Sequence, residues 1–397
     1  MKLLQLNATA NWGSTGKIAE GISEAAINRG WEAYIAFGRY CNKSKSDLIK
    51  VGSQLDVYKH YAKHILFDNE GFGSHNSTKR LIKRIEEIKP DIIQIHNIHD
   101  HWINFRVLFD YLNSSNIQVV WTFHDCWPFT GGCYHFVENN CYQWQSDCKD
   151  CDFRHGLRIK SEKNLEFKTK LIKSLRDKLN IVSVSRWLDS MVTDSHLTEI
   201  NHTYIYNGVD TEIYNIVNPK DIYQKYNLKD EFIILGVSSV WPASKGLGDF
   251  IKLRGLLDES FKIILVGLTK SQIRSLPNGI IGIERTSDVN ELVALYNLAD
   301  VVGSFSKGET FGLTLVEGQA CGTPSLAYSN TALNEIVTDQ TGFKIETGDI
   351  RKAAEKIRYL RDHNPFSPDE CRSRVIREFN KENQFNKYIN LYESLIS

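Results

Sequence analysis

The feature that most constrains the fold of this chain is a regular alternation of short apolar runs with amphipathic runs. Apolar runs typical of buried strands are separated by stretches with helical periodicity in both halves of the sequence. The predicted strands are residues 2–7, 32–38, 91–97, 118–124, 232–237, 261–266, 279–283 and 300–305, and the predicted helices of the first half are 16–28, 78–89 and 105–113. Such alternation is typical of parallel sheets covered by helices. The sequence therefore predicts an α/β fold with two doubly wound units.

Length and composition agree with two domains and exclude several classes of protein. A chain of 397 residues is too long for one ordinary core. The predicted domains are residues 1–210 and 211–380, with a final helix at 381–397 that would cross back to the first domain. Lys and Arg together number 48, as do Asp and Glu, which argues against a dedicated nucleic-acid binder because such proteins are usually basic. We find no secretory signal and no apolar run of roughly 18 residues, so we expect a cytoplasmic location.

The segment Gly308–Glu317 is the strongest candidate for ligand binding. It follows an apolar run, and a helical pattern begins at its glycine. Backbone N–H groups at the start of that helix would point at a phosphate, and they belong to Phe311, Gly312, Leu313 and Thr314. Glu309 in the preceding loop could accept hydrogen bonds from sugar hydroxyls, and Glu317 could hold a ribose. Two glutamates at this spacing also occur on ordinary solvated helix faces, so the spacing alone does not decide.

Two further candidates follow predicted strands of the first half. Gly13 and Ser14 lie between the first strand and the first helix, where small residues let backbone N–H groups approach a phosphate. The run is not a P-loop, because Asn11 and Ile18 occupy the positions of that pattern's first glycine and last hydroxyl residue. An ordinary turn is the alternative. His124 ends a strand, where its imidazole could hydrogen-bond a sugar hydroxyl, although a lone histidine is more often structural.

Three segments, in the expected order, resemble family 4 retaining glycosyltransferases. The run from Glu309 to Glu317 resembles the E-x7-E region of that family, Tyr206–Asp210 resembles its Asn-Gly-Val-Asp crossover, and Ser244–Gly246 resembles its lysine-glycine phosphate contact. The resemblance covers about half of the chain. It implies the GT-B fold, in which two Rossmann-like domains face each other across a cleft, and a nucleotide diphosphate sugar as the donor.

The resemblance also implies roles for individual residues. Glu309 would orient the transferred sugar, Lys245 would neutralise the diphosphate as a compact cation, and His124 matches a histidine that the family carries at a strand end. We take these three as the catalytic candidates.

The nucleobase and the second cation are less well defined. The loop Ile281–Glu284 resembles the segment that binds the base, with Ile283 as the candidate contact. Many family members have an arginine where this chain has Val240. Either another cation compensates or the leaving group is held less tightly, and the candidate cations are Arg254, Lys270 and Arg285.

These features predict a retaining glycosyltransferase whose catalysis needs no metal. Breaking the bond between a sugar and a diphosphate develops charge on both groups, so both must be stabilised, and no paired Asp motif for a metal-bound diphosphate stands out. We expect a UDP- or GDP-linked donor and a saccharide or lipid-linked saccharide acceptor in surface polysaccharide biosynthesis. The alternatives are a nucleotide-sugar epimerase or a phosphorylase of the same architecture, and a non-catalytic carbohydrate-binding protein.

A cysteine-rich insert, residues 126–155, follows the strand that ends at His124. Four of its cysteines form the pattern C-x7-C-x6-C-x2-C, and they are Cys133, Cys141, Cys148 and Cys151. In a cytoplasmic protein disulfides are unexpected, and four thiolates with one close pair fit a structural zinc ion. Buried cysteines without a metal are the alternative.

Basic residues interleave with apolar ones between Lys160 and Lys178. This pattern predicts either a helix that lies on an anionic membrane surface or a solvated helix packed on its own domain. A polar and aromatic cluster follows the strand at 91–97, and it could line the acceptor side or form an ordinary loop; its members are His96, Asn97, His99, His101 and Trp102.

Overall fold

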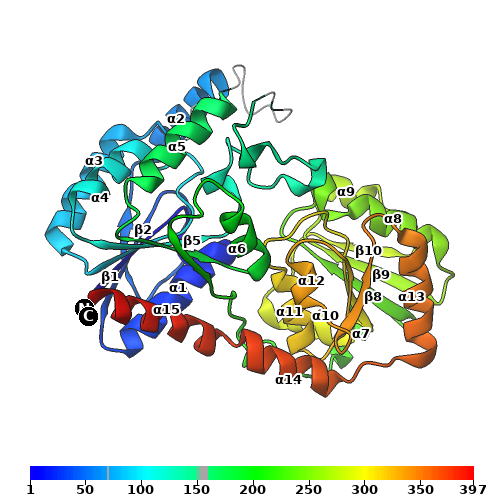
Figure 1. Ribbon diagram of the computed structural model, residues 1–397. Coiled ribbons are helices and arrows are strands. Elements are labelled where there is room, and N and C mark those ends of the chain that lie inside the picture. Colours follow the sequence, from blue (N-terminus) through cyan, green and yellow to red (C-terminus); the bar gives the residue numbers. More distant parts are fainter. Residues whose placement is uncertain (69–70, 150, 152–159) are drawn as a thin grey trace. The chain divides into compact units, whose positions relative to one another are not determined.

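The computed structural model describes residues 1–68, 71–149, 151 and 160–397, which fold into two compact units. The first unit contains Met1–Tyr206 and Glu382–Ser397, and the second contains Asn207–Lys381. Each unit is built on one parallel sheet, and Figure 1 shows helices on both faces of each sheet. The predicted α/β class with two doubly wound units is therefore confirmed.

The first sheet has the strand order β3-β2-β1-β4-β5-β6-β7. Its strands are β1 (Lys2–Asn7), β2 (Glu32–Phe37), β3 (Asp47–Lys50), β4 (Ile92–Ile95), β5 (Gln118–Phe123), β6 (Leu179–Ser183) and β7 (Asn201–Tyr204). The central strands are buried along almost their whole length, as expected where helices cover both faces. The order reverses between β1 and β4, and in doubly wound sheets ligands bind at the carboxyl ends of the strands beside such a reversal.

Helices cover the two faces of the first sheet in separate groups. The helices of this unit are α1 (Gly13–Asn28), α2 (Gln54–Phe67), α3 (His75–Ile88), α4 (Phe105–Ser114), α5 (Ser161–Lys173), α6 (Arg186–Thr193) and α15 (Lys381–Ile396). Side chains of α1 and α15 share a core with the sheet, in which Ile22, Tyr388 and Tyr392 are almost fully buried. On the other face α4 packs against both α3 and α5 (Figure 1).

The second sheet has the strand order β10-β9-β8-β11-β12-β13. Its strands are β8 (Phe232–Val237), β9 (Phe261–Val266), β10 (Ile280–Ile283), β11 (Val301–Ser304), β12 (Ser325–Tyr328) and β13 (Gly342–Ile345). Its helices are α7 (Lys220–Lys225), α8 (Leu247–Leu256), α9 (Lys270–Arg274), α10 (Val289–Leu298), α11 (Leu313–Ala320), α12 (Leu333–Ile336), α13 (Ile350–His363) and α14 (Pro368–Phe379). The order reverses between β8 and β11, so this sheet has its own switch point.

The structure adds elements that the sequence pattern did not predict. They include the strands β3, β6, β7, β12 and β13 and the helices α2, α6, α12, α13 and α14, and the first helix begins at Gly13 rather than at Gly16. The strands β3 and β7 are largely solvent-exposed edge strands, so they lack the apolar run by which we identified the others. Among the residues that the structure describes, no helix has both the length and the apolar character of a membrane-spanning segment.

A glycine allows the loop after β8 to approach the end of β11. Gly246 has a φ of 80°, and a Cβ atom at this position would lie 2.3 Å from the carbonyl oxygen of Phe305. The backbone N–H of Lys307 donates to the carbonyl of Ser244 at 2.9 Å across the same contact. Only glycine accommodates both the backbone conformation and this distance.

We predict that Gly246→Ala destabilises the second unit by about 2 kcal/mol or more, because a side chain adds left-handed backbone strain to a clash with Phe305. Gly248→Ala is the matched control. It lies two residues away in α8, and its added Cβ would meet nothing within 4 Å, so it should be neutral or stabilise by up to about 1 kcal/mol. Urea unfolding of the two variants measures the difference. Equal stability of both would show that the contact at Gly246 is not required.

Candidate active site

The structure brings Lys245 and Glu309 together at the carboxyl edge of the second sheet. Lys245 ends a short 3-10 helix (η4, Ala243–Lys245) after β8, and Glu309 lies in the loop between β11 and α11. The Lys245 Nζ donates to Glu309 Oε1 at 2.5 Å, and both side chains are partly accessible. They lie in the loops that follow β8 and β11, the two strands that flank the switch point. The sequence predicted both as site residues, although it did not predict that they would contact each other.

Glu309 is held by a residue that the sequence reasoning missed. Its backbone N–H donates to the Oγ1 of Thr331 at 3.0 Å, and its carbonyl accepts from the N–H of Ala332 at 3.3 Å. Thr331 is buried and has a φ of 44°. It lies 22 residues from Glu309, so no local sequence pattern could have shown the contact.

The predicted phosphate-binding helix is present as α11. Gly312 precedes it with a φ of 105°, and no side chain caps the helix. The N–H groups of Leu313 and Thr314 lie in its first turn, where a helix offers donors without intrahelical partners. The Phe311 side chain is buried against Phe379 at a ring distance of 5.7 Å, so this side chain cannot contact a ligand.

Glu317 has protein partners in this structure. The hydroxyl of Tyr296 donates to its Oε2 at 2.8 Å, and the hydroxyl of Tyr214 also bonds to its carboxylate. Burial raises the pKa of both tyrosines, and the Glu317 carboxylate raises it further, so both remain protonated donors. A ribose at Glu317 would therefore have to share the carboxylate with these two hydroxyls.

The candidates for the nucleobase and the second cation are less favourably placed. Ile283 ends β10 with its side chain buried, and its carbonyl accepts from the N–H groups of Gly267 and Leu268. Arg254 donates to the carbonyls of three residues, Leu257, Asp258 and Phe261, at the far end of α8. The Arg254 guanidinium is therefore already engaged in hydrogen bonds within the second unit.

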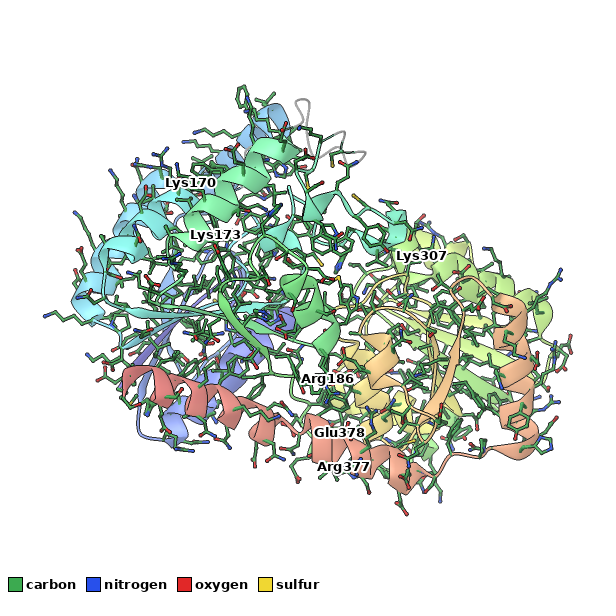
Figure 2. All side chains as sticks on the ribbon, in the orientation of Figure 1. Lys170, Lys173, Arg186, Lys307, Arg377 and Glu378 are labelled. Atoms are coloured by element: carbon green, nitrogen blue, oxygen red, sulfur yellow. The ribbon has the colours of Figure 1, made fainter. Side chains whose placement is uncertain are left out.

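Lys307 is an exposed cation near Glu309 that the sequence reasoning did not single out. It lies in the loop that follows β11, and its backbone is bonded to Ser244 beside Lys245. Figure 2 labels its side chain on the second unit. The sequence could have indicated Lys307, because it immediately precedes the candidate segment Gly308–Glu317. Lys270, the first residue of α9, and Arg285, in the loop after β10, are also exposed.

In the first unit, Gly13 and Ser14 form the first turn of α1 and are exposed. A Cβ atom at Gly13 would meet nothing within 4 Å, and the φ of this residue is 67°. The backbone of this turn is therefore open to a ligand at the carboxyl end of β1. This is the switch point of the first sheet, where the sequence placed a phosphate contact.

Histidines gather at the carboxyl ends of β4 and β5. His96 follows β4 and His124 follows β5, and the Nδ1 of His96 lies 2.9 Å from the Nε2 of His124. The Nε2 of His99 lies 2.8 Å from Asp125 Oδ2. Burial lowers the pKa of His99, but Asp125 and Asp100 outweigh that effect and hold it well above its ordinary value. A buried charged pair therefore lies directly beside His124.

The rest of this polar cluster belongs to the core of the first unit. His96, His99, His101 and Trp102 are each less than a tenth exposed. The indole N–H of Trp102 donates to the carbonyl of Asn97 at 3.2 Å. Asn97 and His124 are, in contrast, partly exposed.

The four cysteines of the predicted metal site lie within electrostatic range of one another. Burial raises the pKa of the Cys133 thiol to about 12, and the thiols of Cys151, Cys148 and Cys141 raise it further. The backbone N–H of Gly131 donates to the sulfur of Cys148. Among the described residues, however, no three Cys, His, Asp or Glu side chains are arranged to hold a metal ion. Part of the insert, Asp150 and residues 152–155, lies outside the described residues.

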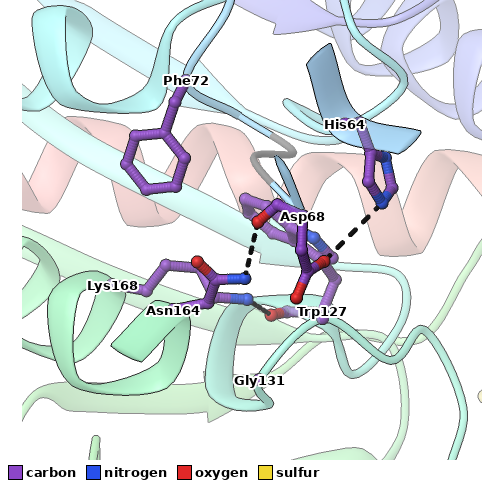
Figure 3. Close-up of a pocket in the computed structure, with 8 residues that line it drawn as sticks. His64, Asp68, Phe72, Trp127, Gly131, Asn164 and Lys168 are labelled. Carbon is purple, nitrogen blue, oxygen red and sulfur yellow. Dashed lines mark hydrogen bonds and ion pairs between the residues drawn. The ribbon is translucent and has the colours of Figure 1, made fainter. Parts of the chain in front are cut away.

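A small pocket with both polar and apolar lining residues lies between α2, α5 and the 3-10 turn after β5 (η1, Trp127–Phe129). Figure 3 shows Asp68 beside His64, and the amide of Asn164 donating to the Asp68 carbonyl at 3.1 Å. The Lys168 Nζ is buried and donates to the carbonyl of Trp127 at 2.5 Å. None of the lining residues is a predicted site residue, although Trp127 lies in the turn that follows the carboxyl end of β5.

Profiles of two glycosyltransferase families match the two units. The profile described as "Glycosyltransferase Family 4" matches residues 16–213, and that described as "Glycosyl transferases group 1" matches residues 231–363. Together they cover most of both units.

Relatives with established names match parts of the chain. The O-antigen chain mannosyltransferase RfbU of Salmonella typhimurium is 29% identical over 161 residues, which are 38% of this chain and 44% of RfbU. The capsular polysaccharide biosynthesis glycosyltransferase CapM of Staphylococcus aureus is 24% identical over 232 residues, which are 52% of this chain and 59% of CapM. The chain thus spans about half the length of these relatives.

Solved structures match the whole chain. Sucrose-phosphate synthase from Thermosynechococcus elongatus has a TM-score of 0.74 at 16% identity, with 99% of this chain and 98% of that chain covered. Anabaena HepE in complex with UDP has a TM-score of 0.69 at 15% identity, with 99% and 100% covered. These similarities establish the GT-B fold. The two matching profiles, which together cover most of the chain, show that it belongs to family 4 of the glycosyltransferases.

Proposed function

We propose that this protein transfers a sugar from a nucleotide diphosphate sugar to a saccharide acceptor in the synthesis of a surface polysaccharide. The observation that carries the proposal is the contact between Lys245 and Glu309 beside the first turn of α11. A cation, a carboxylate and helix N–H donors at one sheet edge suit a diphosphate joined to a sugar. The names of RfbU and CapM support a polysaccharide product, and the UDP complex of HepE supports a UDP-linked donor.

The two charges would have separate partners during the reaction. Lys245 would leave Glu309 to neutralise the diphosphate, while the freed Glu309 carboxylate would accept hydrogen bonds from the sugar. His124 and the turn at Gly13 and Ser14 would contribute from the first unit, which we assign to acceptor binding. As the family resemblance implies, we propose that the anomeric configuration is retained and that a phosphate oxygen takes the proton of the acceptor without a catalytic metal.

Two variants test this assignment, because one should affect nucleotide binding and the other should affect turnover. Lys245→Met should weaken the binding of UDP or GDP about tenfold or more, because a charge-assisted contact to phosphate is lost. Glu309→Gln should not weaken that binding, since it removes the carboxylate that competes for Lys245. It should nevertheless lower kcat for sugar transfer about 100-fold through loss of an oriented contact. Calorimetry with each nucleotide and a transfer assay measure the two effects.

Lys262→Met is the matched control for Lys245→Met. Lys262 pairs with Glu231 at 3.8 Å, and the side chains are exposed to a similar degree, 27% and 18% against 29% and 21% for Lys245 and Glu309. It lies at the start of β9, at the opposite edge of the same sheet, so it should bind nucleotide normally. Equal binding by Lys245→Met and Lys262→Met would remove Lys245 from the site.

We also propose that the cysteine-rich insert holds a structural zinc ion. The support is the close Cys148-x2-Cys151 spacing and the electrostatic proximity of all four thiols, while the side chains would have to reorient to reach tetrahedral geometry.

Elemental analysis of protein purified under reducing conditions should find about one zinc per chain. Cys148→Ser should lower that content, while Cys41→Ser, at an exposed cysteine on another loop, should not. Zinc-free wild-type protein with normal stability would exclude the site.

Contact with an anionic membrane is better assigned to α2 than to the predicted basic segment. In α5 the apolar residues Leu165 and Ile172 are buried in the unit, and the exposed residues of the helix are polar ones such as Lys170 (Figure 2). On α2, in contrast, large apolar side chains are exposed by 37% to 61%, and they are Leu55, Tyr58, Tyr61, Ile65, Leu66 and Phe67. Lys59 and Lys63 are exposed on the same helix. We propose that this surface lies on anionic lipid.

The triple variant Tyr58→Ser, Tyr61→Ser, Ile65→Ser tests this surface. It should reduce co-sedimentation with phosphatidylglycerol vesicles at least tenfold, since each apolar side chain withdrawn from lipid costs about 1.5 kcal/mol or more. The control variant, Tyr359→Ser with Ile376→Ser, removes exposed apolar groups of the second unit and should bind as the wild type does. Equal binding to phosphatidylcholine vesicles would contradict the role of anionic lipid.

A further inference from the structure

A line of buried polar side chains connects α1 to His124 in the first unit. Gln5 lies in β1, and its Nε2 donates to the carbonyl of Ala19 at 2.6 Å and to the hydroxyl of Ser23 at 2.7 Å, both in α1. The Oε1 of Gln5 lies 2.8 Å from the Nε2 of His96. The Nδ1 of His96 lies 2.9 Å from the Nε2 of His124. Gln5 and His96 are almost completely buried, at 0% and 1% exposure, so water cannot replace these bonds.

The first member of the line determines where the protons lie. A backbone carbonyl can only accept, so the Gln5 atom beside Ala19 is the amide nitrogen and the atom beside His96 is the oxygen. An amide oxygen also only accepts, so the Nε2 of His96 carries a proton. Burial lowers the pKa of His96 well below its ordinary value, and His124 lowers it further. His96 is therefore neutral, and its Nδ1 carries the lone pair.

The same reasoning extends to His124. Because the Nδ1 of His96 accepts, the Nε2 of His124 must donate. Burial lowers the pKa of His124 to about 4; Asp125 opposes this shift and His99 adds to it. At neutral pH the His124 ring thus holds one proton, at Nε2, and its lone pair is on Nδ1.

We propose that Gln5 and His96 are positioning residues that hold His124 in the Nε2–H tautomer, so that its Nδ1 accepts a hydrogen bond from a hydroxyl group of the bound sugar. The inference deepens the proposed function and rests on it for the identity of the ligand. A hydroxyl that donates to Nδ1 keeps both oxygen lone pairs for other partners, whereas an Nδ1–H group would occupy one of them. The tautomer of His124 therefore determines whether the sugar hydroxyl donates to the imidazole or accepts from it.

Nitrogen-15 NMR of the full chain labelled in histidine tests the proposal directly, because long-range proton–nitrogen correlations distinguish the two neutral tautomers. In the wild type we expect His96 and His124 both to be protonated at Nε2. In Gln5→Leu, His96 loses its acceptor and should carry its proton at Nδ1 instead, which turns His124 to the Nδ1–H form. The kcat for sugar transfer should then fall roughly tenfold, with KM changed less.

The neighbouring strand supplies a matched control. Gln94 is the register partner of Gln5 in β4, is equally buried, and bonds to Thr122 and Tyr392 rather than to a histidine. Gln94→Leu should keep both the His124 tautomer and kcat. If Gln5→Leu does not fold, His96→Asn and His96→Leu replace it. The asparagine oxygen can still accept from the Nε2–H of His124, so only the leucine variant should lose the tautomer.

A wild-type His124 protonated at Nδ1 would overturn the proposal. The same tautomer in Gln5→Leu as in Gln94→Leu would also overturn it. The expected tautomers in a protein that binds no nucleotide and transfers no sugar would support the hydrogen-bond line and overturn the proposed function, so the two failures are distinguishable.

Discussion

Parallel strand pairing is the constraint on which the candidate site depends. In both units the strand order reverses beside the first strand, between β1 and β4 and between β8 and β11. Parallel pairing places every carboxyl end at one edge of the sheet, so loops far apart in sequence meet there. Lys245 and Glu309 meet in this way in the second unit, as do His96 and His124 in the first. An antiparallel β11 would separate the first pair, and an antiparallel β4 would separate the second.

The contact between Lys245 and Glu309 also explains how a charged site can exist without its ligand. Each charge neutralises the other while both remain partly accessible, so neither is buried alone. In the proposed function, a diphosphate sugar would offer an anion to the lysine and hydroxyls to the glutamate. Ligand binding would then exchange one set of polar contacts for another, while the hydrogen bond from the Glu309 N–H to Thr331 would be retained.

Sequence could predict the fold class and the main charged residues because both leave local patterns. Apolar runs marked the buried central strands, and the loop motifs marked Lys245 and Glu309. Contacts made through the fold left no such pattern. The tyrosines that bind Glu317, and the Gln5 amide that directs His96, are distant in sequence from their partners. The polar edge strands β3 and β7 were missed because solvent exposure removes the apolar run.

The placement of α15 bears on the order in which the chain acquires its structure during synthesis. Phe385, Tyr388 and Tyr392 fill the same core as Leu3 and Ile18. That core stays incomplete on the ribosome until residue 392 has emerged from the exit tunnel. The second unit, encoded wholly within residues 207–381, has all its core residues available earlier. The apolar core residues of the amino-terminal half would therefore wait longest for their packing partners.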